Sequence, residues 1–530
     1  MISSSSLGVG APGPGDPPGD AADGDAVAGF VEQLQHKGMV LWLENGGLRY
    51  RAPKGALTRF ELERLSVHKD QVRALLERAR DAQGRESGRP RLSQAPLAFS
   101  QLAHWQIHQL GERCVSRNVA SATRLSGRLN IEALSKAMAE VVRRHDALRT
   151  RIVVAEGVPL QMIDSGIECD LRIDDLTPLQ GSERQSEIMR RIESFMLEPV
   201  DVSTGPLFGA RILKLTDTEW VLILALEHII SDAVTLDIAL REILTAYAQA
   251  AQGHAISLPA VPFQFSEYAS WQRNTHRSWV ERHGQYWNDH FRGCGRVRFP
   301  DGPSRSGAAV GWSSIPLQIR TGLRAELGEW CRSRRASLPM AVFTAYAALV
   351  LRWCGVPSAV VRYQSDGRAG PRLHDTLGFF ASRLYLRVDL RENDSFLSLL
   401  ERVTEEYCSA VEHDDFTYME TQTPPPESSR NTFFNWIPQP HSSGIFGSPE
   451  SENVIQTHRV PFVNPWFRNL EWDNEPMTLL YDADGEITGR VYFSLQRLSV
   501  TTMERFGRHF VVFIERLLRA AEDRIGGIPF

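Results

Sequence analysis

The sequence has few of the features that mark secreted, membrane-spanning or metal-binding proteins. Its six cysteines are scattered over 530 residues with no CxxC pair or Cys/His cluster, which argues against a zinc site and a disulfide framework. No apolar run is much longer than one strand, whereas a membrane helix needs about 20 apolar residues. Residues 1–25 are rich in Gly, Pro, Ser and Asp and lack the segments of a signal peptide. We expect a disordered lead over 1–25 and a cytoplasmic protein that binds no metal and no membrane.

Charge is also unremarkable. The formal net charge is −5, and no block of like charges forms a tail, so nothing predicts a nucleic-acid partner. Hydrophobic residues make up 42% of the chain, an ordinary globular value, and the length predicts two to four domains.

Residues 26–80 form a small unit with the predicted element order αββαα. The stretch AVAGFVEQLQHKG predicts a helix that ends at Gly38. Apolar and polar residues then alternate on both sides of Asn45-Gly46-Gly47, which is typical of a β-hairpin. The stretches LTRFELERL and VHKDQVRALLERAR predict two further helices, and the polar residues 81–94 predict a linker.

Basic residues crowd the second strand of this hairpin and its exit, namely Arg49, Arg51 and Lys54, with Tyr50 among them. One interpretation is a solvated basic face. The other is an open strand edge with basic flanks, which can take up an acidic peptide as an added strand.

From residue 95 onward, strands and helices are mixed without a repeat, which predicts an α/β (α+β) fold. A helix is expected after Asn130 as its N-cap. A hairpin that turns at Asp217-Thr218 is expected to lead into a second helix, with Ser231 as its cap and Gly253 as its stop.

His228 lies where the apolar strand of this hairpin ends, at the mouth of a short loop. Histidine titrates near neutral pH and can accept or donate a proton. A buried histidine satisfied by a backbone partner is the other interpretation, and spacing alone favours it.

The wider sequence resembles the condensation domains of nonribosomal peptide synthetases. Residues 227–233, EHIISDA, match the family motif HHxxxDG position by position. Six further stretches follow the family's order and spacing: PLAFSQLAHW (96–105), RHDALRT (144–150), YASWQ (268–272), LGFFASRLYLR (377–387), HDDF (413–416) and SSRNTFFNW (428–436). The resemblance implies two chloramphenicol acetyltransferase-like lobes, expected at 95–274 and 275–530, that form a V-shaped pseudo-dimer around a tunnel.

The resemblance also implies the site and its partners. His228 is the catalytic histidine, and Asp232 pairs with Arg368 of RYQSDGR in the other lobe. The other interpretation of Asp232 is that it helps to cap the helix that begins there, and both can hold. Carrier proteins present the substrates on phosphopantetheine arms, and no cofactor is bound directly. The chain departs from the motif at Glu227, which replaces the first histidine, and at Ala233, which replaces glycine and should narrow the tunnel or shift substrate choice. We also expect the Glu227 carboxylate either to raise the pKa of the His228 ring or to change how the loop is bonded.

The segment VLWLENGGLRYRAPKGALT is similar to the TubC-type β-hairpin docking domain. That resemblance implies that the tail of an upstream carrier subunit adds to the hairpin. The chain has no carrier motif LGGxS, no phosphate loop and no GxSxG elbow. We therefore expect both acyl partners to arrive on carrier proteins in trans, or one of them as a free molecule.

Three functions stay open at this point. The first is a free-standing condensation enzyme that forms an amide or ester in a nonribosomal peptide or polyketide assembly line, including chain release. The second is a noncatalytic docking and recruitment scaffold with the same fold. The third is a heterocyclisation-type domain, whose DxxxxD motif Glu227 and Asp232 echo loosely, although retention of His228 argues against it.

Overall fold

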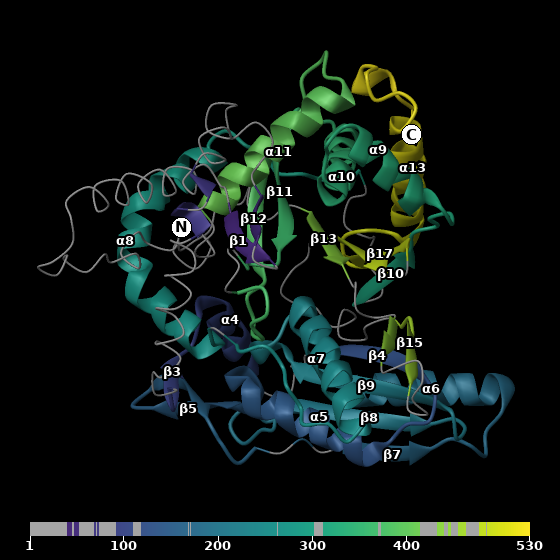
Figure 1. Cartoon of the computed structure of the whole chain (residues 1–530). Helices are drawn as coiled ribbons and strands as arrows, with labels where there is room; N and C mark the ends of the chain where they lie inside the picture. The colour runs from purple at the N-terminus through teal and green to yellow at the C-terminus, as the bar shows by residue number, and fades with distance from the viewer. Residues whose placement is uncertain are drawn as a thin grey trace, which may run out of the picture.

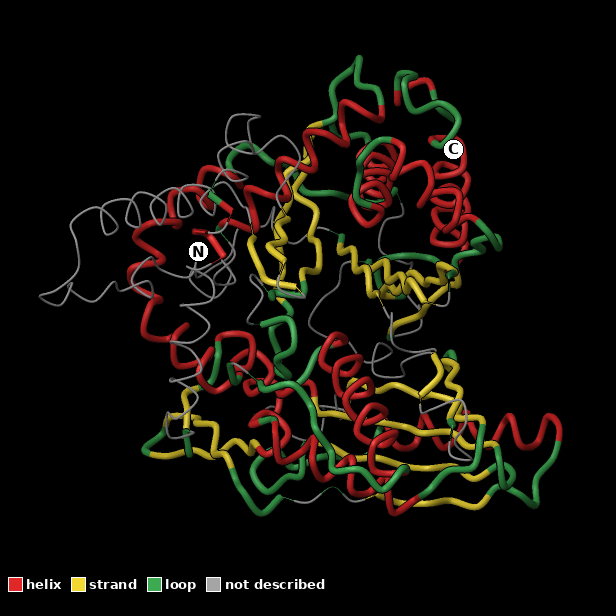
Figure 2. Tube along the Cα trace, in the orientation of Figure 1, coloured by secondary structure: helices red, strands yellow, loops and turns green. Residues whose placement is uncertain are grey.

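The computed structural model describes residues 40–44, 47–51, 68–69, 71–73, 92–109, 118–167, 169, 171–261, 263–300, 311–368, 373–413, 432–438, 444–446, 454–462, 476–483 and 485–529. Within them the chain forms an α/β structure of two lobes, each built on a six-stranded sheet (Figure 1). Figure 2 shows helices, in red, beside the strands, in yellow, of both lobes.

The N-terminal lobe contains a sheet with the strand order β14-β15-β4-β9-β8-β7 and a three-stranded sheet with the order β3-β6-β5. Their strands are β3 (Gln94–Pro96), β4 (Asn118–Ser126), β5 (Thr150–Ala155), β6 (Val158–Ile163), β7 (Leu171–Asp175), β8 (Phe208–Lys214), β9 (Glu219–Glu227), β14 (Gly444–Phe446) and β15 (Ile455–Arg459).

Helices cover both faces of the larger sheet, and this explains the unbroken apolar run of β9. Leu222 and Leu224 pack in the cluster that includes α5 (Ile131–Arg144) and α7 (Ala233–Ala251). Val221 and Ile223 point the other way, into the cluster formed with α6 (Gly181–Met196). A strand buried on both faces has no polar alternation, because neither face meets water.

The local predictions for this lobe agree with the structure except at one cap. The Asn130 side chain accepts a hydrogen bond from the Ala133 N–H, as expected of an N-cap. Strands β8 and β9 form the predicted hairpin. The cap of α7, however, is Asp232 rather than Ser231, because the Asp232 carboxylate accepts from the Thr235 N–H. The Ser231 hydroxyl instead donates to the carbonyl of Glu227, at 3.0 Å.

The C-terminal lobe has the strand order β10-β17-β16-β13-β11-β12. Its strands are β10 (Trp312–Pro316), β11 (Ser358–Ser365), β12 (Ser382–Asp389), β13 (Phe433–Pro438), β16 (Met477–Ala483) and β17 (Glu486–Ser494). Its helices are α9 (Leu323–Ser333), α10 (Leu338–Cys354), α11 (Phe396–Glu412) and α13 (Val500–Leu517), and the short 3-10 turn η7 (Ile525–Gly527) follows.

No single helix in the described part of the chain is long and apolar enough to cross a membrane. One bent pair, α9 with α10, reaches the required length and composition only when both halves are counted together across a bend of 103°.

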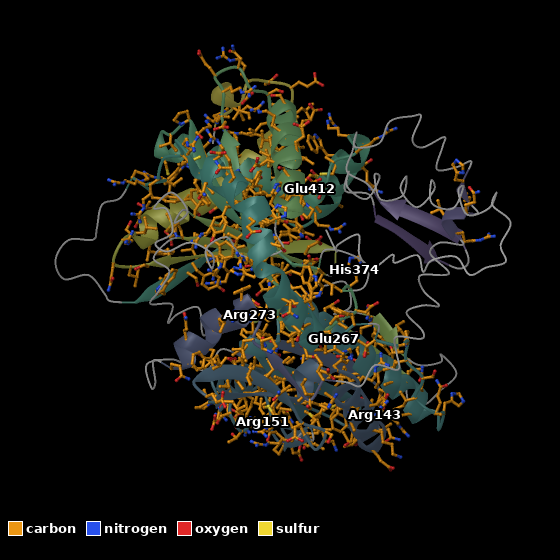
Figure 3. All side chains as sticks on the ribbon, turned by 90° about the vertical axis from the view of Figure 1, so that its left-hand side faces the viewer. Arg143, Arg151, Glu267, Arg273, His374 and Glu412 are labelled. Atoms are coloured by element: carbon orange, nitrogen blue, oxygen red, sulfur yellow. The ribbon has the colours of Figure 1, made fainter. Side chains whose placement is uncertain are left out.

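Two connections join the lobes. The long helix α8 (Phe265–Phe291) contains the boundary expected between residues 274 and 275. Figure 3 shows its residues Glu267 and Arg273 between Glu412 above and Arg143 and Arg151 below. Strand β15, although late in the sequence, pairs with β4 of the N-terminal sheet. The chain therefore returns to the first lobe after most of the second has formed.

The predicted hairpin of the amino-terminal unit is present as β1 (Val40–Glu44) and β2 (Gly47–Arg51), which pair antiparallel with Leu41 opposite Tyr50. The lead, Lys54, the linker up to residue 91 and most of the helices expected in this unit lie outside the described residues.

Candidate functional site

Strand β9 delivers His228 to the junction of the two lobes. Its ladder ends at Glu227, whose N–H donates to the carbonyl of Leu207 at 2.8 Å. The chain then makes one 3-10 turn, η4 (His228–Ile230), in which both isoleucines are fully buried. These isoleucines anchor the turn in the core and leave the half-buried His228 at its edge.

The hydrogen bond of the His228 ring fixes its neutral tautomer. Nδ1 lies 2.7 Å from the carbonyl oxygen of Ser231. A carbonyl oxygen only accepts, so Nδ1 must carry the proton, and Nε2 is the nitrogen that can accept one. This is the arrangement that a general base requires.

Two rings from different lobes hold the His228 imidazole in place. His104, on α4 (Phe99–His108), has its ring centroid 4.6 Å from that of His228. Phe379, from the loop before β12, also lies 4.6 Å from His228 and 4.7 Å from His104. Neither His104 nor Phe379 was assigned a role from the sequence.

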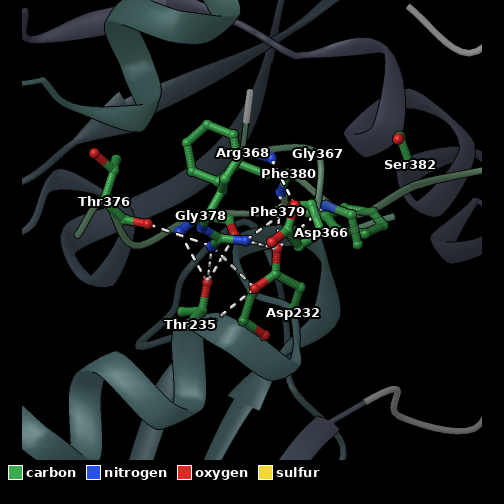
Figure 4. Close-up of polar contacts among 12 residues, drawn as sticks. Asp232, Thr235, Asp366, Gly367, Arg368, Thr376, Gly378, Phe379, Phe380 and Ser382 are labelled. Carbon is green, nitrogen blue, oxygen red and sulfur yellow. Dashed lines mark hydrogen bonds and ion pairs between the residues drawn. The ribbon is translucent and has the colours of Figure 1, made fainter. Parts of the chain in front are cut away.

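Asp232 and Arg368 form a buried bidentate ion pair between the lobes (Figure 4). The Arg368 Nη1 and Nη2 atoms lie 2.8 and 3.0 Å from the two carboxylate oxygens. The side chains are only 1% and 3% exposed for Arg368 and Asp232. The pairing implied by the family resemblance is therefore present in the structure.

The Asp232 carboxylate accepts more than this ion pair. The Phe380 N–H donates to it at 3.0 Å and the Ala381 N–H at 3.2 Å. Desolvation raises the pKa of Asp232, but the Arg368 charge and the hydrogen bonds outweigh it and hold the pKa below its usual value. The carboxylate thus stays ionised and ties the start of α7 to the loop before β12.

The remaining bonds of Arg368 keep that loop close. The Thr235 hydroxyl lies 3.1 Å from Nη2 and donates to the carbonyl of Gly378 at 2.7 Å. Gly367 has a φ of +63°, and a Cβ there would lie 1.9 Å from the carbonyl oxygen of Phe380. Only glycine permits this approach. Ser382, at the start of β12, is drawn apart from these contacts in Figure 4.

Glu227 is fully buried, and its carboxylate turns away from the His228 ring. One oxygen lies 2.6 Å from Nε2 of His108, one helical turn after His104 on α4. The other accepts from the backbone N–H of His228. Glu227 therefore bonds within the loop and to α4. The sequence signal for the His108 partner is the pair of histidines, His104 and His108, four residues apart in α4.

Ala233 is the first residue of α7 and lines a cavity with an empty volume of about 670 Å³. The cavity lies between β4, α7 and the C-terminal half of the chain, which contributes Ile437, Phe462 and Tyr481. A methyl group at position 233 therefore occupies space at the start of this cavity.

Of the predicted docking residues, Arg49, Tyr50 and Arg51 lie on β2, opposite Trp42, Leu41 and Val40 of β1. Lys54 lies outside the described residues.

Comparison with known proteins agrees with this geometry. The family described as condensation domain matches residues 92–527, and the TubC N-terminal docking domain matches residues 27–77. The chain is 27% identical over 446 residues, 83% of its length, to the chondramide synthase cmdD of Chondromyces crocatus. It is 31% identical over 373 residues, 67% of its length, to the phosphinothricin tripeptide synthetase PhsC of Streptomyces viridochromogenes. It spans only 11% and 34% of these two relatives.

Solved structures show the same fold. The condensation domain of the monacolin K polyketide synthase MokA matches with a TM-score of 0.67 at 15% identity, covering 82% of this chain and 99% of that one. The X-domain from teicoplanin biosynthesis matches with a TM-score of 0.64 at 21% identity, covering 83% and 98%.

Proposed function

The chain belongs to the condensation-domain family, and we propose that it transfers an acyl group from a carrier-bound thioester to an amine or hydroxyl acceptor. Within this proposal His228 is the catalytic residue, and Asp232 with Arg368 braces its loop. The observation that carries it is the half-buried His228 ring between His104 and Phe379 at the lobe junction, where its Nδ1 bond to the Ser231 carbonyl makes Nε2 the proton acceptor.

In the proposed reaction, Nε2 takes the proton of the acceptor as the acceptor atom attacks the thioester carbonyl carbon. The tetrahedral intermediate collapses with cleavage of the C–S bond, and the departing thiolate recovers the proton from His228. Atoms and charge balance without a cofactor of the protein, since the carrier's phosphopantetheine arm supplies the thioester. Holding the two substrates in line would contribute several kcal/mol to lowering the barrier.

The site favours this function over the heterocyclisation-type alternative. A second catalytic carboxylate would have to face the substrate, whereas the Glu227 side chain is fully buried and bonded to His108 and to its own backbone. The same contacts weigh against the noncatalytic scaffold, since Glu227 is accommodated by a matched partner and the His228 ring keeps its packing.

We further propose that the hairpin recruits an upstream carrier subunit by strand addition to β2, with Arg49, Arg51 and Lys54 attracting an acidic tail. Cytoplasmic location and action in trans stay predictions.

Intact-protein mass spectrometry of carrier proteins tests the function. Carriers loaded with a panel of acyl and aminoacyl groups would be mixed with and without the chain, and transfer should shift the acceptor mass by the donor acyl group. A chain that binds loaded carriers but produces no mass shift with any pair would support the scaffold instead.

A further inference from the structure

Strand β4 directs its backbone groups alternately to its two neighbours in the sheet. The Gly127 N–H, just beyond β4, donates to the Thr218 carbonyl at 2.8 Å, so odd-numbered residues face β9. On the other side, the Val460 N–H donates to the Ala122 carbonyl at 2.8 Å, so even-numbered residues face β15. The N–H and C=O of Ala120 therefore point to the β15 side.

Strand β15 does not extend far enough to meet them. It pairs with Thr123–Ser126 of β4, and Val460 adds one more bond. In this register Phe462 lies opposite Ala120, and no bond joins their backbone groups. Among the described residues, no backbone group pairs with Ala120 on this side. Within the described part of the chain, the outward-facing N–H and C=O of Ala120 thus form an open edge of β4.

The cavity that Ala233 lines runs along this open edge. Residues 119–123 of β4 line it, opposite Leu236 and Leu240 of α7. The Ser121 hydroxyl in this wall is buried and has no hydrogen-bond partner within the described residues. An open strand edge that lines a cavity can accept an extended ligand as an added strand.

The edge leads to the catalytic loop. Asn118, the first residue of β4, lies opposite Glu227, and His228 follows directly. Two residues of strand separate Ala120 from Asn118, roughly 7 Å. Ala233, at the other wall, follows Asp232. A chain lying along the edge therefore points toward the His228 turn.

We propose that the open edge of β4 binds an extended chain carrying secondary amides by strand addition. The Ala120 N–H donates to a carbonyl of the ligand, and the Ala120 carbonyl accepts from an amide N–H of the ligand. The inference rests on the proposed function in one respect, since the ligand is the amide-bearing part of a thioester substrate. Two sources carry this chemistry, the pantetheine arm and a peptidyl acyl chain.

Hydrogen–deuterium exchange of the full chain tests the edge directly. The probes are S-methylpantetheine for the arm and an acetyl-capped dipeptide methylamide for the peptidyl chain, each at millimolar concentration. We expect slower exchange of the Ala120 amide with at least one probe. Protection by pantetheine assigns the edge to the arm, and protection by the dipeptide alone assigns it to a peptidyl chain. No protection by either probe overturns the inference.

Matched changes isolate the hydrogen bonds. An ester replacing one amide in the effective probe should weaken binding by about 2- to 13-fold, as expected for one hydrogen bond. Ala120→Pro removes the N–H without touching a bond to β9 and should weaken the parent probe to the same degree, whereas Ala120→Gly should not. Equal affinity of amide and ester probes for the unaltered chain would also overturn the inference, whether or not Ala120→Pro folds.

This test is separable from the test of function. Protection of Ala120 in a chain that never transfers an acyl group would leave the edge standing and remove the enzyme. Transfer without protection would remove only the edge.

Discussion

Breaking the Asp232–Arg368 ion pair should destabilise the protein strongly. Arg368→Ala removes two bonds of 2.8 and 3.0 Å from a carboxylate that is 3% exposed. Three backbone N–H donors, from Thr235, Phe380 and Ala381, would still contact that carboxylate, but its countercharge would be gone. Removing one partner of a buried pair costs about 3–5 kcal/mol of the free energy of unfolding. Asp232→Asn should cost a similar amount, since it leaves a buried guanidinium unpaired.

Urea denaturation measured by tryptophan fluorescence checks this magnitude. The double variant Asp232→Asn/Arg368→Met should lose less than the sum of the single losses, because neither charge is then left alone. Arg277→Ala is the control, because Arg277 pairs with Glu281 on the surface and is 94% exposed; it should change stability by less than about 0.5 kcal/mol.

The pKa of Asp232 is lowered in the folded state, so its contribution to the free energy of unfolding exists above pH about 4 and is lost as pH falls below that. The gap between parent and Arg368→Ala should therefore shrink in acid. Single variants as stable as the parent at pH 7 would refute the reasoning.

Other consequences concern Glu227, Glu406 and the docking unit. His108→Ala leaves the buried Glu227 carboxylate without its side-chain partner and should lower the free energy of unfolding by about 1–3 kcal/mol. Adding Glu227→Gln should recover part of this loss. Equal melting of the parent and His108→Ala would contradict this pairing. Burial raises the pKa of Glu406 to about 7. Protonation of this carboxyl therefore contributes to the free energy of unfolding fully below about pH 4.5, and the contribution is lost as pH rises through 7. Glu406→Gln should therefore gain stability relative to the parent between pH 5 and 8, by about 3 kcal/mol at most, and a pH-independent difference in urea midpoints would contradict it. Deletion of residues 1–80 should slow transfer at low carrier concentration and restore it at high concentration, because the docking tether raises effective concentration; equal rates at every concentration would remove the docking role.

Local features of the fold were predictable because local physics decides them. The periodicity of residues 131–144 and the Asn130 cap predicted α5, and the apolar run before His228 predicted a buried strand. The return of β15 to the first lobe was not predictable, because five residues near position 457 carry no signal of a partner more than 300 positions earlier. The open edge of β4 was not predictable for the same reason, because it depends on where β15 pairs.

The contacts of the candidate site also divide into those that the sequence could predict and those that depend on the tertiary structure. Family resemblance implied the pairing of Asp232 with Arg368 across 136 positions, where spacing gives no information. The contacts of His104 with His228 and of His108 with Glu227 depend on α4 lying beside the 3-10 turn, which is a tertiary fact. Ser231 and Asp232 are both good cap residues, and the choice between them depends on the turn that Ser231 closes.

The most direct test of the central claim is the acyl-transfer rate of His228→Ala, measured by mass spectrometry of loaded carriers with the parent as reference. His228 is half-buried, and the substitution leaves the neighbouring side chains in place. The urea midpoint of the variant should therefore differ from that of the parent only by the lost packing of the ring. Its rate should fall by about 10²–10⁴, the usual contribution of a general base. A folded His228→Ala protein with the turnover of the parent would contradict the catalytic assignment.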